Sequence, residues 1–172
     1  MNHLAFQPAF DVLHTEFRFL RIRRILTSNR HWRYDQIRIA DFYLAFPFRL
    51  GDVRLKPIHR SVKRLAQEFS KGRYESQPDD HLLFSRMQPI HRAAAETLIA
   101  NGFFDEKAFK SELIAETGKI EPPALSARIE QVNADHASLM EVIRTMLEDY
   151  PLLGANGLKD RTGLLEFRYD AI

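Results

Sequence analysis

The chain has 172 residues, of which 45% are hydrophobic, and this is enough for one domain with a proper core. It contains no cysteine, which excludes disulfides, thiolate nucleophiles and cysteine-ligated zinc and fits a reducing compartment. The formal net charge is only +2, but residues 1–73 carry 15 Lys/Arg against 6 Asp/Glu, and residues 74–172 carry 10 against 17. Either the halves face each other or solvate themselves, or the basic half meets nucleic acid or an acidic partner surface.

The N-terminal stretch lacks the features of a signal peptide. Residues 1–14, MNHLAFQPAFDVLH, contain no basic region followed by an apolar run. We therefore expect a cytoplasmic protein that makes no membrane contact.

Residues 6–27 are predicted to form a first amphipathic helix, with Asp11 placed to cap its N-terminus. Its apolar stripe repeats at helical spacing through Phe10, Leu13, Phe17 and Leu20. The other face carries a row of arginines: Arg18, Arg21 and Arg24, with Arg23 beside them. Such a row is usually a solvated face, and the alternative is a contact surface for an acidic ligand.

The chain is expected to pack around a helix over residues 35–46, DQIRIADFYLAF, which is apolar on almost every face. Asp35 is a candidate N-cap, and Pro47 would end the helix because proline lacks an N–H. At about 12 residues the helix is too short to span a membrane, which takes roughly 20. Trp32, just before it, is predicted to fill the core.

Asp41 lies inside this apolar helix. A buried carboxylate without a partner is costly, so we expect a buried ion pair with an arginine such as Arg18 or Arg38. A deep pocket lined by Asp41 and a histidine would instead indicate an active site.

Residues 57–71 are predicted to form the clearest amphipathic helix of the chain, with Pro57 suited to its first turn. One face is apolar from Ile58 to Phe69, and the opposite face is basic. The candidate contacts with nucleic acid or an acidic partner, taken from both basic faces, are Arg18, Arg21, Arg24, Arg60, Lys63 and Arg64.

Residues 79–104 are interpreted as two helices joined near residues 86–88, with Pro89 starting the second and Gly102 capping it. This pattern is typical of helix-turn-helix and winged-helix cores. The second helix would offer bases only a few polar side chains: His91, Arg92, Glu96 and Asn101. A winged-helix shape used for protein contact is therefore favoured over one that reads DNA sequence.

The C-terminal third is predicted to be helical, with one long helix or two over residues 124–149. Residues 107–117 could be a helix or a wing strand. The closing segment is rich in apolar side chains, which we expect to dock on the chain's own fold or on a partner: Leu164, Leu165, Phe167 and Tyr169.

The predicted fold class is mainly α with minor β, as one domain over residues 1–172 with a winged-helix-like helix-turn-helix core. We divide it into a basic helical half (1–73), a winged-helix-like segment (74–120) and a C-terminal helix with a docking tail (121–172). No phosphate-binding glycine loop, zinc-protease helix or nucleophile elbow occurs, and no two histidines are spaced i, i+4 on a helix. We therefore predict no catalytic, cofactor or metal site, and no enzyme.

Three stretches together resemble the small middle components of prokaryotic three-component systems built around an ABC/SMC-like ATPase, a group that includes Lamassu-type antiphage defence. They are residues 6–20 (FQPAFDVLHTEFRFL), 41–48 (DFYLAFPF) and 87–103 (MQPIHRAAAETLIANGF), and residues 157–170 (GLKDRTGLLEFRYD) are similar as well. The resemblance lies in hydrophobic anchors and in the placement of proline and glycine. It implies a non-catalytic helical subunit that binds the SMC-like ATPase beside a nuclease-like effector, with DNA held mainly by the ATPase.

Three functions remain open on the sequence. The first is an adaptor that binds the ATPase and couples DNA sensing to the effector, as the resemblance implies. The second is a winged-helix DNA-binding protein, for example a repressor, whose basic residues neutralise phosphates. The third is a small enzyme built around Asp41 and a histidine.

Overall fold

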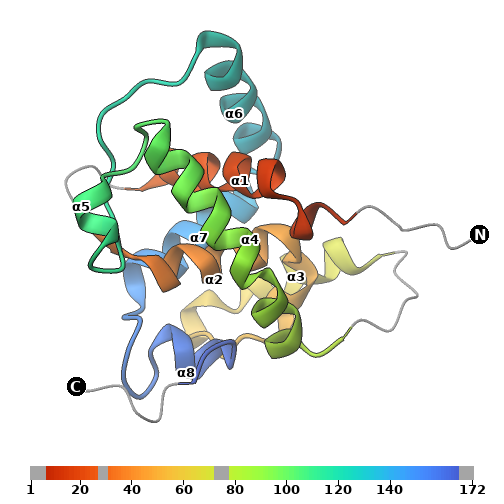
Figure 1. Ribbon diagram of the computed structural model, residues 1–172. Coiled ribbons are helices and arrows are strands. Elements are labelled where there is room, and N and C mark those ends of the chain that lie inside the picture. The colour runs from red at the N-terminus through yellow and green to blue at the C-terminus, as the bar shows by residue number, and fades with distance from the viewer. Residues whose placement is uncertain (1–6, 27–30, 72–77, 167–172) are drawn as a thin grey trace, which may run out of the picture.

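The computed structural model describes residues 7–26, 31–71 and 78–166, and these are mainly helical (Figure 1). The α-helices are α1 Val12–Ile25, α2 Tyr34–Ala45, α3 Ser61–Ser70, α4 Asp80–Ala100, α5 Glu106–Phe109, α6 Pro123–Asp135, α7 Ala137–Asp149 and α8 Leu158–Thr162. Three short 3₁₀-helices lie at Pro8–Phe10 (η1), Pro47–Asp52 (η2) and Pro57–His59 (η3). Two short strands, β1 Trp32–Arg33 and β2 Leu113–Ile114, complete the elements. Within the described residues, no helix is both long and apolar enough to cross a membrane.

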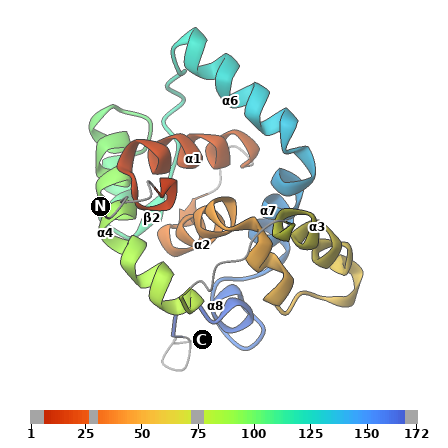
Figure 2. The same ribbon diagram turned by 90° about the vertical axis from the view of Figure 1, so that its right-hand side faces the viewer.

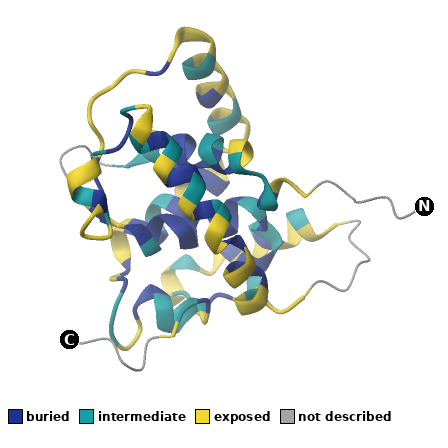
Figure 3. Cartoon of the chain, in the orientation of Figure 1, coloured by how far each residue is buried: buried dark blue, intermediate teal, exposed yellow. Residues whose placement is uncertain are grey.

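Helix α2 is the centre of the molecule, as its composition predicts. It lies between α1 and α4 on one side and α3, α7 and α8 on the other (Figure 2). Ile37, Ile39, Phe42 and Tyr43 are almost completely buried along it, and the buried part of the chain is concentrated around it (Figure 3). The expectation of a buried central helix is confirmed.

The two ends of α2 differ in how well they were predicted. The helix ends at Ala45 and Pro47 opens η2, so proline stops the helix as expected. At the other end Asp35 is not the N-cap, and that prediction is wrong. Arg33 occupies the cap position, its backbone N–H donates to Oε1 of Gln36 at 3.1 Å, and Asp35 forms an ion pair with Arg38 instead.

Helix α1 begins where the capping signal places it. The Asp11 carboxylate accepts the backbone N–H of His14 at 2.9 Å, which satisfies one of the free donors of the first turn. The prediction of a helix with this cap is confirmed, but the predicted apolar stripe is wrong at Leu13, which is 72% exposed while Arg18 and Arg21 are buried.

Helix α4 is one continuous helix of 21 residues, so the predicted pair of helices joined near residues 86–88 is wrong. Pro89 lies inside it and is exposed, as is Ser85 four residues earlier, whose carbonyl loses its helical partner. That carbonyl can bond water, so the proline is tolerated on this side. The opposite side stays buried from Phe84 through Met87 to His91, and this packing holds the helix together. The helix-turn-helix expected here is replaced by a single helix.

Residues 107–117 contain both structures that the sequence left open. Helix α5 is capped by Asp105, whose carboxylate accepts the N–H of Ala108 at 2.7 Å. Strand β2 then pairs antiparallel with β1, in the register that sets Trp32 opposite Ile114. Trp32 is buried, so its predicted role in the core is confirmed.

The stretch over residues 124–149 is two helices, not one. His136 separates α6 from α7 with a backbone conformation outside the helical region. Helix α6 projects from the rest of the domain, while α7 packs beside α2 and α3 (Figure 2).

Candidate functional site

The arginines of α1, which the sequence offered as a contact surface, point largely into the protein. Arg18 is 6% exposed. Its Nε donates to Oδ1 of Asp41 at 2.7 Å and its Nη2 to Oδ2 at 3.1 Å. The remaining donors bond the carbonyl oxygen of Pro8 and the hydroxyl of Thr15. The predicted ion pair of Asp41 with an arginine is confirmed, and Arg18 is the partner.

His91 completes this buried cluster from α4. Its Nε2 lies 3.0 Å from Oδ2 of Asp41, and its Nδ1 lies 3.5 Å from Nε of Arg38. Because an arginine can only donate, Nδ1 accepts and Nε2 carries the proton that it donates to Asp41. His91 has no exposed surface, so the expectation that it is available to DNA bases is wrong.

Charge in this cluster is balanced by pairing. Burial alone would raise the pKa of Asp41, but the positive charge of Arg18 and the hydrogen bond from His91 outweigh it and lower that pKa below its usual value. Burial lowers the pKa of His91, in spite of the opposing bond to Asp41. The cluster therefore holds an ionised carboxylate, a charged arginine and a neutral histidine at neutral pH.

A carboxylate hydrogen-bonded to a histidine can act as an acid/base pair. On the sequence, a deep pocket lined by Asp41 and a histidine was the arrangement that would indicate an active site. Both Asp41 and His91 have no exposed surface, and neither lines the hollows described below. No substrate can reach them in this structure, so the cluster acts as an internal tie between α1, α2 and α4. Among the residues that the structure describes, no group of His, Cys, Asp or Glu side chains could hold a metal ion.

Arg21 is also used internally. It is 7% exposed, its Nε donates to Oδ1 of Asn133 at 2.9 Å, and its Nη2 contacts the Sδ of Met140 at 3.3 Å. Asn133 donates in return to the carbonyl oxygen of Arg21 at 3.2 Å. Burial lowers the pKa of Arg21. This residue ties α1 to α6 and α7, and the expectation of a solvated arginine face is wrong for it and for Arg18.

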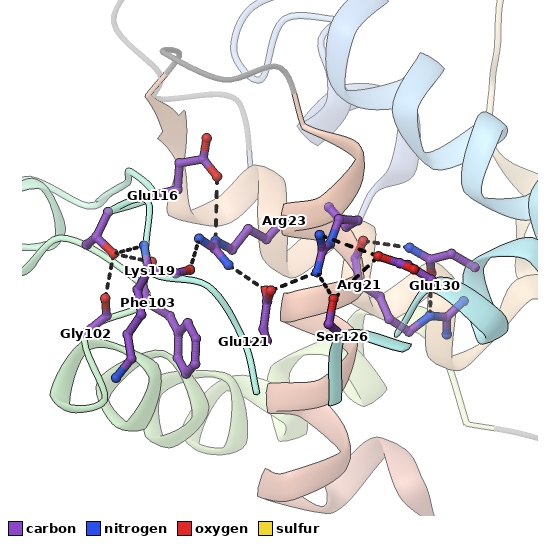
Figure 4. A network of polar contacts seen from close by, with 12 residues as sticks. Arg21, Arg23, Gly102, Phe103, Glu116, Lys119, Glu121, Ser126 and Glu130 are labelled. Atoms are coloured by element: carbon purple, nitrogen blue, oxygen red, sulfur yellow. Dashed lines mark hydrogen bonds and ion pairs between the residues drawn. The ribbon is translucent and has the colours of Figure 1, made fainter. Parts of the chain in front are cut away.

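The last two arginines of α1 bind the loop that leads into α6. Glu121 is only 4% exposed, and its two carboxylate oxygens accept from Arg23 at 2.5 Å and from Arg24 at 2.8 Å. Arg23 also donates to the carbonyl oxygen of Lys119 at 2.7 Å. Figure 4 shows Glu121 between Arg23 and Ser126, which accepts from Arg24 at 2.9 Å. Arg24 is exposed, but its charge is already paired.

The basic residues of α3 stand in clear contrast. Arg60, Lys63 and Arg64 are all exposed. Within the described parts of the chain, their side chains have no hydrogen-bond or ion-pair partner. They lie at the N-cap and in the first turns of α3, which has no acidic residue in its first turn. The positive end of the helix dipole disfavours cations at that place.

A hollow of about 130 Å³, which we call the basic hollow, lies beside the start of α3. Among the described residues that line it, Asp52 is the acidic one, and the basic ones are Arg54, Lys56, His59, Arg60 and Lys63. Of these, Arg54 forms an ion pair with Asp160 at 2.7 Å, and Nδ1 of His59 lies 2.6 Å from the hydroxyl of Tyr150. Nζ of Lys56 donates to the carbonyl oxygen of Asp149 at 3.3 Å, while the side chains of Arg60 and Lys63 have no partner among the described residues.

A larger groove of about 570 Å³, which we call the α3–α7 groove, lies on the other side of the same turn. It is lined by Ser61, Val62, Arg64, Leu65 and Glu68 of α3 and by Ala137, Ser138, Glu141 and Val142 of α7. Val62 lines the basic hollow as well, so the two depressions adjoin. The helices run antiparallel, because Phe69 lies against His136 at one end and His59 lies against Tyr150 at the other.

The family model of the ABC-three component (ABC-3C) system Middle Component 5 matches residues 4–170 of this chain. The chain belongs to that family. Comparison with curated proteins and with solved structures finds no match. The resemblance to middle components of ABC-type three-component systems is thereby confirmed at the level of the family.

The C-terminal segment of this middle component docks on its own fold as far as the structure describes it. Leu164 is buried and Leu165 is half-buried, following the short helix α8. The backbone N–H of Arg54 donates to the carbonyl oxygen of Arg161 at 3.3 Å and joins this segment to the loop before α3. Phe167 and Tyr169 lie outside the described residues.

The middle component thus brings together three of the six predicted contact residues, Arg60, Lys63 and Arg64, at one end of α3. Arg54, Lys56 and His59 were not among the predicted contacts, because Arg54 and Lys56 precede the helical pattern of residues 57–71 and His59 lies in its first turn. The signal that could have found them is charge density, since residues 54–64 hold five of the chain's 25 lysines and arginines, together with His59.

Proposed function

We propose that this middle component is a non-catalytic adaptor of a prokaryotic antiphage defence complex in the cytoplasm. It binds the ABC/SMC-like ATPase of its system and couples DNA sensing by that ATPase to a nuclease-like effector. Family membership supports a part within a multi-component system. The observation that carries the proposal is the basic turn at the start of α3, where Arg60, Lys63 and Arg64 have no partner among the described residues.

These three cations are exposed at one end of α3, where a partner can reach them. Exposed charges of one sign steer a complementary partner and speed its association. The basic residues of α1 contribute little to such a surface, because Arg18 and Arg21 are buried and Arg24 is paired with Glu121. Ile58, which is 81% exposed beside the basic hollow, adds an apolar contact of the kind found in protein interfaces.

The experiment is co-expression with the SMC-like ATPase that we propose as the partner in its system. We expect a stable complex, and we expect the double variant Lys63→Glu/Arg64→Glu to weaken it by roughly tenfold, or about 1.4 kcal/mol. Arg128→Glu is the matched control, since Arg128 is an exposed helical arginine on α6. A monodisperse middle component that does not co-purify with the ATPase would contradict the proposal.

A second candidate function is direct binding of the DNA backbone, and the basic hollow favours it because phosphate is an anion. Two unpaired cations, Arg60 and Lys63, would give a shallow salt dependence, with a slope near −0.9 per phosphate neutralised on duplex DNA. A gel-shift titration of the isolated middle component with duplex DNA at low salt decides between the two. A shift that Lys63→Glu/Arg64→Glu abolishes supports DNA binding, and no shift leaves the adaptor function.

A further inference from the structure

The α3–α7 groove has apolar side chains that the protein's own fold covers only in part. Along α3, Val62 and Ala66 are buried, while Leu65 and Phe69 of the same stripe remain half-buried. From α7, Val142 is half-buried on the opposite wall. Such a stripe on a surface helix is normally covered by a neighbouring element.

The dimensions of the groove correspond to a short helix. It follows α3 from Ser61 to Glu68, which is about two helical turns or roughly 11 Å at 1.5 Å per residue. The walls are two antiparallel helices, and an amphipathic helix can lay its apolar face between them with anchors at i, i+3 or i+4, and i+7. A volume of about 570 Å³ is in the range of cavities that enclose several side chains.

The charges around the groove indicate the chemistry of that helix. Arg64 lines the groove, and Arg60 and Lys63 lie across Val62 in the adjoining hollow, so the start of α3 is a cationic end. Of the two acidic lining residues, Glu141 is already paired with Arg144 at 3.0 Å, and Glu68 lies at the far end of α3. Complementarity requires acidic residues at the end of the ligand that meets Arg60 and Lys63.

We infer that the α3–α7 groove is the docking site for a two-turn amphipathic helix of the partner ATPase, with an apolar face and acidic residues at one end. This inference rests on the proposed function and deepens it, because it names the surface and the kind of segment bound. The apolar face covers Leu65 and Val142, and the acidic end meets Arg60, Lys63 and Arg64.

The test is a steric plug in the full-length protein. Ser138 is exposed and lines the groove, so Ser138→Trp fills it from α7 without touching the core. The matched control is Ala127→Trp, at an exposed position of α6 away from the groove. We expect Ser138→Trp to weaken binding of the co-purified ATPase at least tenfold and Ala127→Trp to leave it within twofold. Circular dichroism and thermal melting confirm that both variants fold.

The failure of this inference is distinguishable from the failure of the proposed function. If the wild-type protein binds the ATPase and Ser138→Trp binds it equally well, the groove is not the docking site and the adaptor function stands. If the wild-type protein does not bind the ATPase at all, both fall.

Overlapping synthetic peptides that cover the ATPase identify the segment. We expect the strongest binder to have apolar residues at helical spacing with Asp or Glu at one end, and to lose binding to Ser138→Trp. A best binder without acidic residues would overturn the proposed charge complementarity.

Light scattering of the isolated middle component tests whether a second copy of this chain fills the groove. A dimer that Ser138→Trp dissociates would show that it does, and this too would overturn the inference.

Discussion

Two helices of this protein, α1 and α3, carry rows of basic residues that look alike in the sequence and differ completely in the fold. On α1, Arg18 and Arg21 are buried and hydrogen-bonded to side chains of other helices. On α3, Lys63 and Arg64 are exposed and have no partner among the described residues. A row of arginines at helical spacing therefore does not by itself distinguish a binding surface from an internal tie.

The difference arises from the position of each helix in the fold. Helix α1 lies between α4 and α6 and over α2, so most of its circumference is covered and its arginines meet acceptors there. Helix α3 lies at the edge and covers η2 with one face only. Breaking a buried ion pair costs several kcal/mol, whereas an exposed charge contributes close to nothing. The two rows should therefore respond very differently to substitution.

The largest effect is expected at Asp41. Asp41→Ala would leave the charged Arg18 buried without its acceptor, and we expect a loss of about 3–5 kcal/mol in the free energy of unfolding. Urea unfolding followed by circular dichroism measures it. The double variant Arg18→Met/Asp41→Leu replaces both charges with apolar side chains and should recover most of this stability. A loss below about 1 kcal/mol in Asp41→Ala would mean that the buried pair is not the tie between α1 and α2.

A smaller effect is expected at Glu121, which binds Arg23 and Arg24 closer to the surface (Figure 4). Glu121→Gln removes the charge but keeps the shape, and leaves one arginine without its acceptor, so we expect a loss of about 1–3 kcal/mol. The same unfolding experiment measures it. Glu130→Gln is the control, because Glu130 is exposed and lies 3.9 Å from Arg24, and its effect should stay within about 0.5 kcal/mol. Equal losses of stability in Glu121→Gln and Glu130→Gln would show that the buried carboxylate contributes no more than the exposed one.

The elements predicted well from the sequence are those that local signals determine. The cap at Asp11, the stop at Pro47 and the all-round apolar pattern of α2 depend on neighbouring residues, and the structure confirms each. The continuity of α4 through Pro89 was not predictable, because it depends on which side of the helix is buried. Exposed Ser85 tolerates the lost hydrogen bond, and buried Met87 and His91 hold the two halves in line.

The candidate site was predictable only in part, for the same reason. The basic face of α3 follows from its periodicity, so Arg60, Lys63 and Arg64 could be named in advance. The burial of the α1 arginines could not be predicted, because their acceptors are far away in the chain. Asp41 is 23 residues from Arg18, and Asn133 is 112 residues from Arg21. The α3–α7 groove likewise requires knowing that two helices more than 65 residues apart lie antiparallel.

The buried cluster also predicts a pH dependence of stability that the basic face does not share. Because the pKa of His91 is lowered in the folded protein from its ordinary 6.5, the unfolded chain binds more protons below that pH. The contribution of His91 to the free energy of unfolding is therefore fully present above pH 6.5. It falls as the pH drops below that value, by up to about 1.4 kcal/mol per pH unit for one proton. The pKa of Asp41 is lowered from 3.8 in the folded protein, so a second loss of stability sets in below pH 3.8.

Urea midpoints at several pH values between about 8 and about 5 measure this dependence. His91→Gln removes the titrating group and keeps a donor for Asp41, so its stability should fall less between pH 6.5 and pH 5 than that of the wild type. The slopes of the two proteins are compared over the same range. An unchanged slope in His91→Gln would show that other groups cause the acid sensitivity.

The smallest effect on stability is expected on α3, and its sign is informative. Arg60, Lys63 and Arg64 are like charges at i, i+3 and i, i+4, at the helix end where the dipole disfavours cations. The triple variant Arg60→Gln/Lys63→Gln/Arg64→Gln should therefore unfold at the same urea concentration as the wild type or be more stable, by up to about 1 kcal/mol. Arg18→Gln, the corresponding change on α1, should destabilise strongly. Cations that lower the stability of the fold are expected at this place if they are needed for binding. A loss of more than about 1 kcal/mol in the free energy of unfolding of the triple variant would show instead that they stabilise the fold.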